Sequence, residues 1–164
     1  MLTATLASLF AVTIAASPVA GTPGPGSSVM LVTLPPPAAR QSEVITVQRL
    51  AAAIETRLGL RETAQGARTS TDPRVACPAG IDYVLSVDAA TIRPMSGANQ
   101  LEPRLSATLT RCADGSAVSA SHSAGVAGTV RLDDPAVTKA YRTLEPLVID
   151  DLVERVAASK RSSG

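Results

Sequence analysis

The run Ile81–Ala89, IDYVLSVDA, constrains the fold more than any other stretch of the chain, because it is rich in β-branched and aromatic residues. Successive side chains of a strand point to opposite faces, so its odd-numbered residues share one apolar face. Those residues are Ile81, Tyr83, Leu85, Val87 and Ala89. The other face is more polar, and Asp82 and Asp88 lie on it without a predicted partner. We therefore expect a central strand with one packed face.

The stretch Leu101–Cys112 repeats this pattern, with apolar residues at odd positions and Ser, Thr and charged residues at even ones. Asp114-Gly115 then lies between two alternating runs, which is a strong hairpin signal. A two-residue turn there pairs Ala113 with Ser116, Leu109 with Ala120, and Ala107 with His122. The pattern thus predicts a three-strand meander to about residue 126, packed on one face and hydroxyl-rich and wet on the other.

A helix-forming segment flanks this meander on each side. The first is predicted over 43–58, with Ser42 as its N-cap, Glu43 in its first turn and Gly59 ending it. The second begins at Asp134-Pro135, a cap followed by a proline at the first helical position, and Pro146 is expected to kink or divide it. Their apolar stripes are Val47, Leu50, Ala51, Ile54 and Leu58, and Val137, Tyr141, Leu144, Val148, Leu152 and Val156.

Two further strands complete the expected sheet. The near-continuous apolar run Val29–Leu34 is typical of a strand buried on both faces, and prolines follow it directly. A weaker strand follows the first helix at 60–65. The resulting order predicts an α+β fold, a two-layer sandwich in which an open mixed sheet (β-α-β-β-β-β order) carries two main helices on one face.

The chain has no Trp, one Phe and two Tyr, so its core is expected to consist of Val, Leu, Ile and Ala. Its 15 basic and 14 acidic residues nearly balance. A balanced chain without an aromatic platform argues against nucleic acid as a partner.

The run Leu2–Ala16 is apolar and Ala-rich and contains no charge, and the small residues of Ser17–Gly21 follow. This order is typical of a secretory signal peptide, with an uncleaved anchor or a buried helix as alternatives. The expected organisation is a signal peptide over 1–20, a flexible linker over 21–28, one α/β domain over 29–159 and a disordered tail over 160–164. We expect a periplasmic or secreted protein without a membrane span after cleavage.

Cys77 and Cys112 are the only cysteines, and in an exported protein such a pair is most simply a disulfide. If Asp82 pairs with Cys112, the bend Pro78–Gly80 brings Cys77 close to its partner. Cys112 has the parity of the polar face, so the chain before Ile81 must curl toward that face. Free thiols are the alternative.

No catalytic, cofactor or metal-binding set emerges from the remaining polar residues. His122 is the only histidine, and its strand neighbour Ser121 points to the opposite face, so the two do not form a dyad. One histidine without a Cys, His or carboxylate cluster excludes a conventional zinc site. Asp133-Asp134 is explained by helix capping, and Asp150-Asp151 by a solvated helix face with an Arg155 ion pair.

The order of these elements resembles a small periplasmic α/β domain found at the amino terminus of TolB and in CsgG-type, LpoB-type and FlgT-type envelope proteins. Gly80, Asp82, Tyr83, Val84 and Leu85 match the (G)-x-D-Y-V-L strand of that family, and Asp114-Gly115 matches its hairpin turn. The resemblance covers about residues 29–157 and implies no catalytic residues. The chain lacks a lipidation cysteine near its amino terminus and has an unusually Ser-rich last strand.

These observations favour a non-enzymatic exported accessory or binding domain of the bacterial cell envelope that acts through an unidentified protein partner. A sheet edge and the hydroxyl-rich face are the expected contact surfaces. The alternatives are a small hydrolase or thiol-redox protein using Cys77/Cys112 or Ser121/His122, and a structural subunit that assembles through an edge strand. The sequence does not specify the oligomeric state.

Overall fold

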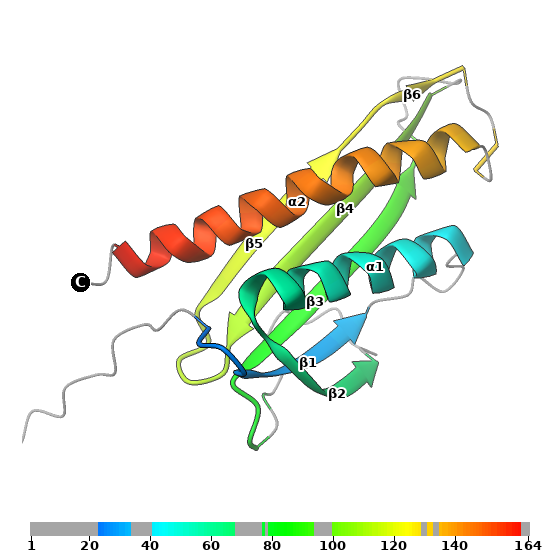
Figure 1. Cartoon of the computed structure of the whole chain (residues 1–164). Helices are drawn as coiled ribbons and strands as arrows, with labels where there is room; N and C mark the ends of the chain where they lie inside the picture. Colours follow the sequence, from blue (N-terminus) through cyan, green and yellow to red (C-terminus); the bar gives the residue numbers. More distant parts are fainter. Residues whose placement is uncertain are drawn as a thin grey trace, which may run out of the picture.

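The computed structural model describes residues 23–33, 41–67, 77, 79–93, 100–128, 131–132 and 135–161. Over these residues the chain forms one sheet and two helices (Figure 1). The helices are α1 (Gln41–Leu58) and α2 (Pro135–Arg161). The strands are β1 (Ser28–Thr33), β2 (Arg61–Ala67), β3 (Tyr83–Ile92), β4 (Gln100–Arg111), β5 (Ala117–Ser123) and β6 (Val126–Ala127).

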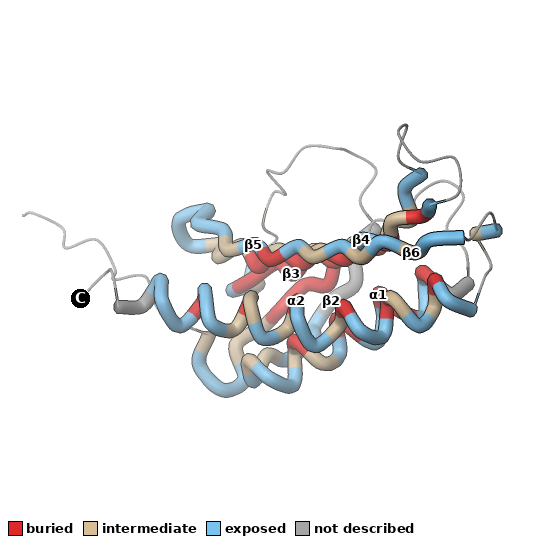
Figure 2. Tube along the Cα trace, turned by 90° about the horizontal axis from the view of Figure 1, so that it is seen from above, coloured by how far each residue is buried: buried red, intermediate tan, exposed pale blue. Residues whose placement is uncertain are grey.

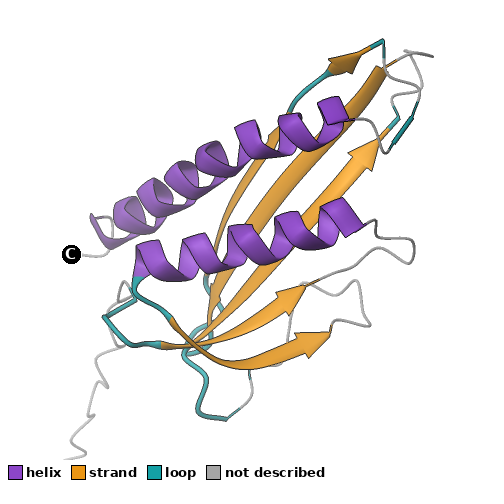
Figure 3. Ribbon diagram, turned by 45° about the vertical axis from the view of Figure 1, so that its right-hand side comes forward, coloured by secondary structure: helices purple, strands orange, loops and turns teal. Residues whose placement is uncertain are grey.

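The sheet has the order β2-β1-β3-β4-β5, and β6 pairs with the start of β4. Strand β1 runs parallel to both β2 and β3, whereas β3, β4 and β5 form an antiparallel meander. Both helices lie side by side on one face of this sheet (Figures 2 and 3). The predicted two-layer α+β fold with an open mixed sheet is therefore confirmed.

The main core fills the space between the helices and the sheet. It contains the predicted stripes of α1 and α2 together with the odd-numbered residues of β3 and β4. Strand β1 is buried on both faces, as its apolar run predicts: Val29 and Leu31 face this core, while Met30 and Val32 belong to a second cluster on the opposite face. Parity thus determines which side of the sheet each residue occupies.

The hairpin between β4 and β5 corrects the predicted pairing by two residues. Leu109 pairs with Val118 and Ala107 with Ala120, so His122 lies opposite Leu105. The loop spans four residues rather than two, because Arg111 N–H donates to Ser116 O at 2.8 Å and Gly115 N–H donates to Arg111 O at 2.9 Å. Gly115 has a φ of 70°, which suits glycine. An even shift preserves parity, so every side chain keeps its predicted face.

Helix ends match the sequence in part. Leu60 N–H donates to Glu55 O and Gly59 N–H to Thr56 O, so Gly59 ends α1 as predicted. The predicted N-cap was wrong, because α1 already begins at Gln41 and includes Ser42 in its first turn. Helix α2 begins at Pro135 as expected, and Pro146 does not divide it. The predicted cap Asp134, and Asp133 before it, lie outside the described residues.

The folded part of the chain begins earlier than expected. Ser28, assigned to the linker, is the first residue of β1. Before it, Gly26 N–H donates to Gly59 O, and Ser27 O accepts from Arg61 N–H, both at 2.8 Å. At the other end, α2 reaches Arg161, two residues beyond the expected domain boundary. The predicted signal peptide lies outside the described residues and stays a prediction.

One polar cluster within the core joins three elements. Glu43 in the first turn of α1 is 4% exposed, and Tyr141 of α2 is fully buried. Thr91 Oγ1 of β3 lies 2.8 Å from Tyr141 Oη and donates to Glu43 Oε1 at 3.2 Å. Tyr141 Oη donates to the same Glu43 oxygen at 3.5 Å. Burial of a carboxylate requires such donors, so the cluster fixes where α1 and α2 meet β3.

Replacing Tyr141 by Phe tests this cluster. The change keeps the buried ring and removes one donor from Glu43, so we expect the free energy of unfolding to fall by about 1–3 kcal/mol in urea denaturation. Thr91→Ser is the matched control, because it retains a hydroxyl at the same place. Equal stability of Tyr141→Phe and wild type would show that the cluster contributes nothing.

Candidate functional site

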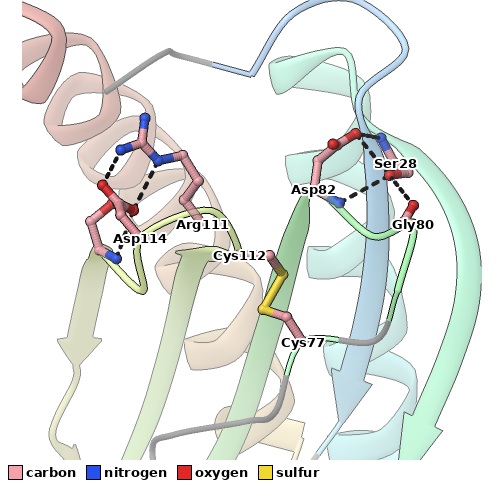
Figure 4. Close-up of a disulfide and its surroundings, with 8 residues drawn as sticks. Ser28, Cys77, Gly80, Asp82, Arg111, Cys112 and Asp114 are labelled. Atoms are coloured by element: carbon pink, nitrogen blue, oxygen red, sulfur yellow. Dashed lines mark hydrogen bonds and ion pairs between the residues drawn. A yellow bond between two sulfur atoms is a disulfide. The ribbon is translucent and has the colours of Figure 1, made fainter. Parts of the chain in front are cut away.

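A disulfide joins Cys77 to Cys112 at one end of the sheet (Figure 4). Its Cα atoms are 5.5 Å apart, and it joins residues 35 positions apart in the sequence. The register between β3 and β4 makes this possible, because Tyr83 pairs with Arg111 and Cys112 N–H donates to Asp82 O at 2.8 Å. This is the register on which the sequence argument for the disulfide depended.

The disulfide lies on the face of the sheet opposite to the helices. Cys77, Ile81 and Cys112 pack against Met30, Val32 and Val84, which form the second apolar cluster. The sequence placed Ile81 on the helix face with Tyr83, and this was wrong. Strand β3 begins only at Tyr83, after a bend at Asp82, so the parity of the strand does not extend back to Ile81.

The residues Gly80 and Asp82, matched above to a family strand, connect the starts of β1 and β3. Gly80 has a φ of 81°, which L side chains rarely adopt, and its carbonyl accepts from Ser28 Oγ at 3.0 Å. Asp82 Oδ2 accepts from both Ser28 N–H, at 2.9 Å, and Ser28 Oγ, at 2.8 Å. These bonds to Ser28 hold the pKa of Asp82 below its ordinary value. Asp82 is therefore a structural link.

A cavity of about 580 Å³ lies beside the disulfide. Its lining includes Tyr83, Asp82, Arg111 and both cysteines. Arg111 forms an ion pair with Asp114 in the hairpin loop, and this pair holds the pKa of Asp114 well below its usual range. The charged groups of the cavity thus already have partners in the fold (Figure 4).

The rest of this face, on β3, β4 and β5, carries an array of hydroxyl groups, which we call the hydroxyl face. Cross-strand pairs align its members in rows, with Ser86 beside Thr108 and Ser119, and Asp88 beside Ser106 and Ser121. Thr108 Oγ1 and Ser119 Oγ are 2.9 Å apart. No helix of the described part of the chain covers this face (Figure 2).

Asp88 is the acidic member of the hydroxyl face. It is half-buried between its neighbours, and this burial raises the pKa of its carboxyl above the ordinary value, with only a backbone bond at Ala89 acting the other way. A carboxylate in such a place lowers the stability of the fold at neutral pH. Residues that cost stability are found preferentially at functional sites.

Ser121 and His122 point to opposite sides of β5, as predicted from their spacing. Ser121 is exposed on the hydroxyl face beside Ser106. His122 faces α2, where its Nε2 lies 3.2 Å from Asp151 Oδ2. Arg155 Nε donates to Asp151 Oδ1 at 2.6 Å, so the predicted Asp151–Arg155 ion pair is present. The fold therefore does not bring Ser121 and His122 together.

The described residues show neither a metal centre nor a membrane-spanning helix. Within them, no group of three or more His, Cys, Asp and Glu side chains is arranged to hold a metal ion. Neither described helix is long and apolar enough to cross a membrane.

Comparison with known proteins supports the fold. No family model matches the chain, and no curated protein matches it. A hypothetical protein of Chlamydia trachomatis is a similar solved structure, with 9% identity, coverage of 82% of this chain and 99% of its own, and a TM-score of 0.50. At that identity the likeness concerns the fold alone.

Two other similar structures come from Helicobacter pylori and Neisseria meningitidis. A homolog of the neuraminyllactose-binding hemagglutinin from Helicobacter pylori has 12% identity, coverage of 90% and 96%, and a TM-score of 0.47. Lipoprotein GNA1162 from Neisseria meningitidis has 14% identity, coverage of 80% and 99%, and a TM-score of 0.38. The neighbours thus include lipoproteins, while the finer resemblance to TolB, CsgG, LpoB or FlgT domains stays a prediction.

Removing the disulfide with the double variant Cys77→Ala/Cys112→Ala is expected to lower the free energy of unfolding by about 3–4 kcal/mol, because the unfolded chain gains the entropy of the opened loop. Urea denaturation of oxidised wild type and the double variant measures the difference. Wild type treated with a reductant should approach the variant. An unchanged midpoint would mean that the thiols are not joined in solution.

Asp88→Asn should be more stable than wild type at neutral pH, because the amide carries no charge to desolvate. The pKa of Asp88 is raised in the folded state, so wild type recovers stability as the pH falls through that pKa, and the advantage of the variant shrinks. Melting temperatures of both proteins across the acidic range measure this. Asp150→Asn, on an exposed part of α2, is the control. If the melting temperatures of Asp88→Asn and wild type differ by the same amount at all pH values, the raised pKa of Asp88 is contradicted.

Proposed function

We propose that this protein is a non-enzymatic accessory protein of the bacterial cell envelope, and that it binds another envelope protein through the hydroxyl face. The observation that carries the proposal is the asymmetry of the sheet. One face is closed by two helices, whereas the other presents aligned Ser and Thr side chains around a half-buried carboxylate.

An envelope location is supported by the disulfide. Cys77 and Cys112 join in a region that packs against buried apolar residues, and such structural disulfides persist in oxidising compartments and are rare in the cytosol. The leading apolar segment, with its small-residue cleavage region, is consistent with export. Both features follow from the chain itself and do not depend on its distant structural neighbours.

Binding through the hydroxyl face is supported by its chemistry. Ser and Thr side chains both donate and accept hydrogen bonds, and short side chains lose little conformational entropy when a partner covers them. Arg104 and Glu102 extend the array on β4 with charges of both signs. A polar surface that extends over three strands suits a protein partner better than a small molecule, which requires a concave, mostly apolar pocket.

The alternative function as a hydrolase or thiol-redox protein finds less support in the geometry. Ser121 lies on the hydroxyl face while His122 faces α2, and the cysteines are joined beside an apolar cluster. The non-enzymatic proposal predicts which property changes in three variants. Their melting temperatures alone should differ from that of wild type in Cys77→Ala, Cys112→Ala and His122→Ala.

A large charged side chain introduced in the middle of the hydroxyl face tests whether the partner binds there. Thr108→Arg should reduce capture of the partner from an envelope extract by about tenfold or more, because the new side chain holds the two surfaces apart. Thr143→Arg is the matched control, since it makes the same change on an exposed position of α2. Quantitative mass spectrometry of the material retained by wild type and both variants measures the effect. Identical sets of captured proteins would refute this use of the face.

A further inference from the structure

We propose that β5 pairs with β5 of a second copy of this chain, so that two sheets join into one across a twofold axis that passes by Ala120. This inference is independent of the proposed function, because it rests on the edge of the sheet rather than on the hydroxyl face.

The two edges of the sheet differ in their protection. Edge strands expose unpaired backbone groups, and proteins usually guard them with charges, prolines or bulges. Strand β2 has such guards: Arg61 and Glu62 are exposed, and the β1–β2 register shifts between Val29 and Met30. Strand β5, with the sequence AVSASHS, contains no Lys, Arg, carboxylate or proline, and its pairing with β4 is unbroken.

The backbone groups of β5 that point outward can be identified from its pairing. Ser116 O accepts from Arg111 N–H, and Ala124 N–H donates to Pro103 O, so the even-numbered groups point toward β4. Because the pattern alternates, the N–H and C=O groups of the odd-numbered residues point to the outer edge. These residues are Ala117, Ser119, Ser121 and Ser123. Within the described residues, no strand pairs with this edge.

These outward groups are self-complementary. An antiparallel partner centred on Ala120 places Ser119 opposite Ser121 of the second copy, and Ala117 opposite its Ser123. All four are residues with outward groups, so each pair can exchange two backbone hydrogen bonds. On the helix side, Val118 comes opposite His122 of the second copy and Ala120 opposite its own equivalent. No pair brings two carboxylates, or two Lys or Arg, together.

The helices also fit this arrangement. Helix α2 lies above β4 and β5, and the equal parity of the paired residues places both copies of α2 on the same face. Their axes would then be two strand spacings apart, ~9.6 Å, which falls within the ~8–10 Å of packed helices. The flank of α2 above β5 contains Asp151 and, one turn earlier, Leu147, which is 48% exposed. When the two β5 strands pair, we expect α2 of the second copy to cover Leu147 in part.

The interface is small. A seven-residue strand is ~23 Å long, and with one helix flank it gives an interface near the lower limit of ~1,200 Å² for specific complexes. The dimer should therefore dissociate on dilution.

The first test is sedimentation equilibrium of the disulfide-intact chain over a series of concentrations, in which the average mass should rise about twofold. Ser121→Pro removes an outward N–H while leaving the ladder with β4 intact, so it should remain a monomer. Ser121→Ala, which keeps the N–H, should dimerise like wild type. Circular dichroism checks that the proline variant is folded.

The second test fixes the register and does not depend on the proline variant. In the proposed pairing the Cα atoms of Ala120 in the two copies lie ~4.5 Å apart, which is within reach of a disulfide between cysteines at these positions. Ala120→Cys should therefore form a cross-linked dimer on mild oxidation, whereas Val118→Cys should not, because those positions are ~13 Å apart.

Three outcomes would overturn the proposal. They are a monomeric mass at every concentration, undiminished dimerisation of a folded Ser121→Pro variant, and preferential cross-linking through Val118→Cys. Growth beyond two copies would indicate head-to-tail assembly and would equally exclude the twofold pairing. A single copy already presents Thr108, which lies on the hydroxyl face of β4 and not at the β5 edge. Loss of capture in Thr108→Arg can therefore occur with or without dimerisation, so failure of this inference and failure of the proposed function are distinguishable.

Discussion

The pairing of β3 with β4 is the constraint on which the rest of the structure depends. With Tyr83 opposite Arg111, every odd-numbered residue of both strands faces the helices and every even-numbered one faces away. The same register brings Cys112 opposite Asp82, where the chain before β3 can reach it. A slip by one residue would bury Ser106 and Thr108 under α2 and expose Leu105 and Leu109, so the register is strongly specified.

This constraint separates the two faces by chemistry. On the helix side, Val, Leu, Ile and Ala side chains and the two buried tyrosines, Tyr83 and Tyr141, form the core. The Glu43–Thr91–Tyr141 cluster fixes the position of both helices. On the other side, the disulfide and the Met30–Val32–Val84 cluster occupy the region of β1 and β3, which leaves β4 and β5 polar. Within the described residues, the stabilising contacts are thus concentrated away from the hydroxyl face, and neither described helix covers it.

The face of the sheet on which each strand residue lies could be predicted from the sequence. The alternation of apolar and polar residues has a period of two, so an error of two residues in the pairing leaves the faces unchanged. The predicted β4–β5 pairing differed from the observed one by two residues, and because this error was even, each side chain of the hairpin lies on its predicted face. Features that depend on distant pairing were missed. Ser28 and Asp82 meet because β1 and β3 are parallel neighbours, and the pKa of Asp88 is raised mainly by its burial in the folded sheet. The burial of Glu43 was missed for another reason, because an acidic residue at a helix start already has an explanation in the helix dipole.

The hydroxyl face and the β5 edge are connected by geometry. Ser119 and Ser121 supply both the outward backbone groups of the edge and two hydroxyls of the face. In a single copy the Ser-rich strand forms the border of the sheet, where a partner would cover it from one side only. Pairing of two β5 strands places it in the centre of a larger sheet, flanked on both sides by the Ser and Thr residues of β4. The same symmetry gives a second Asp88, related to the first by the twofold axis. A partner that spans this surface would meet two equivalent sets of groups, and its affinity could then exceed that for one copy without any new type of contact.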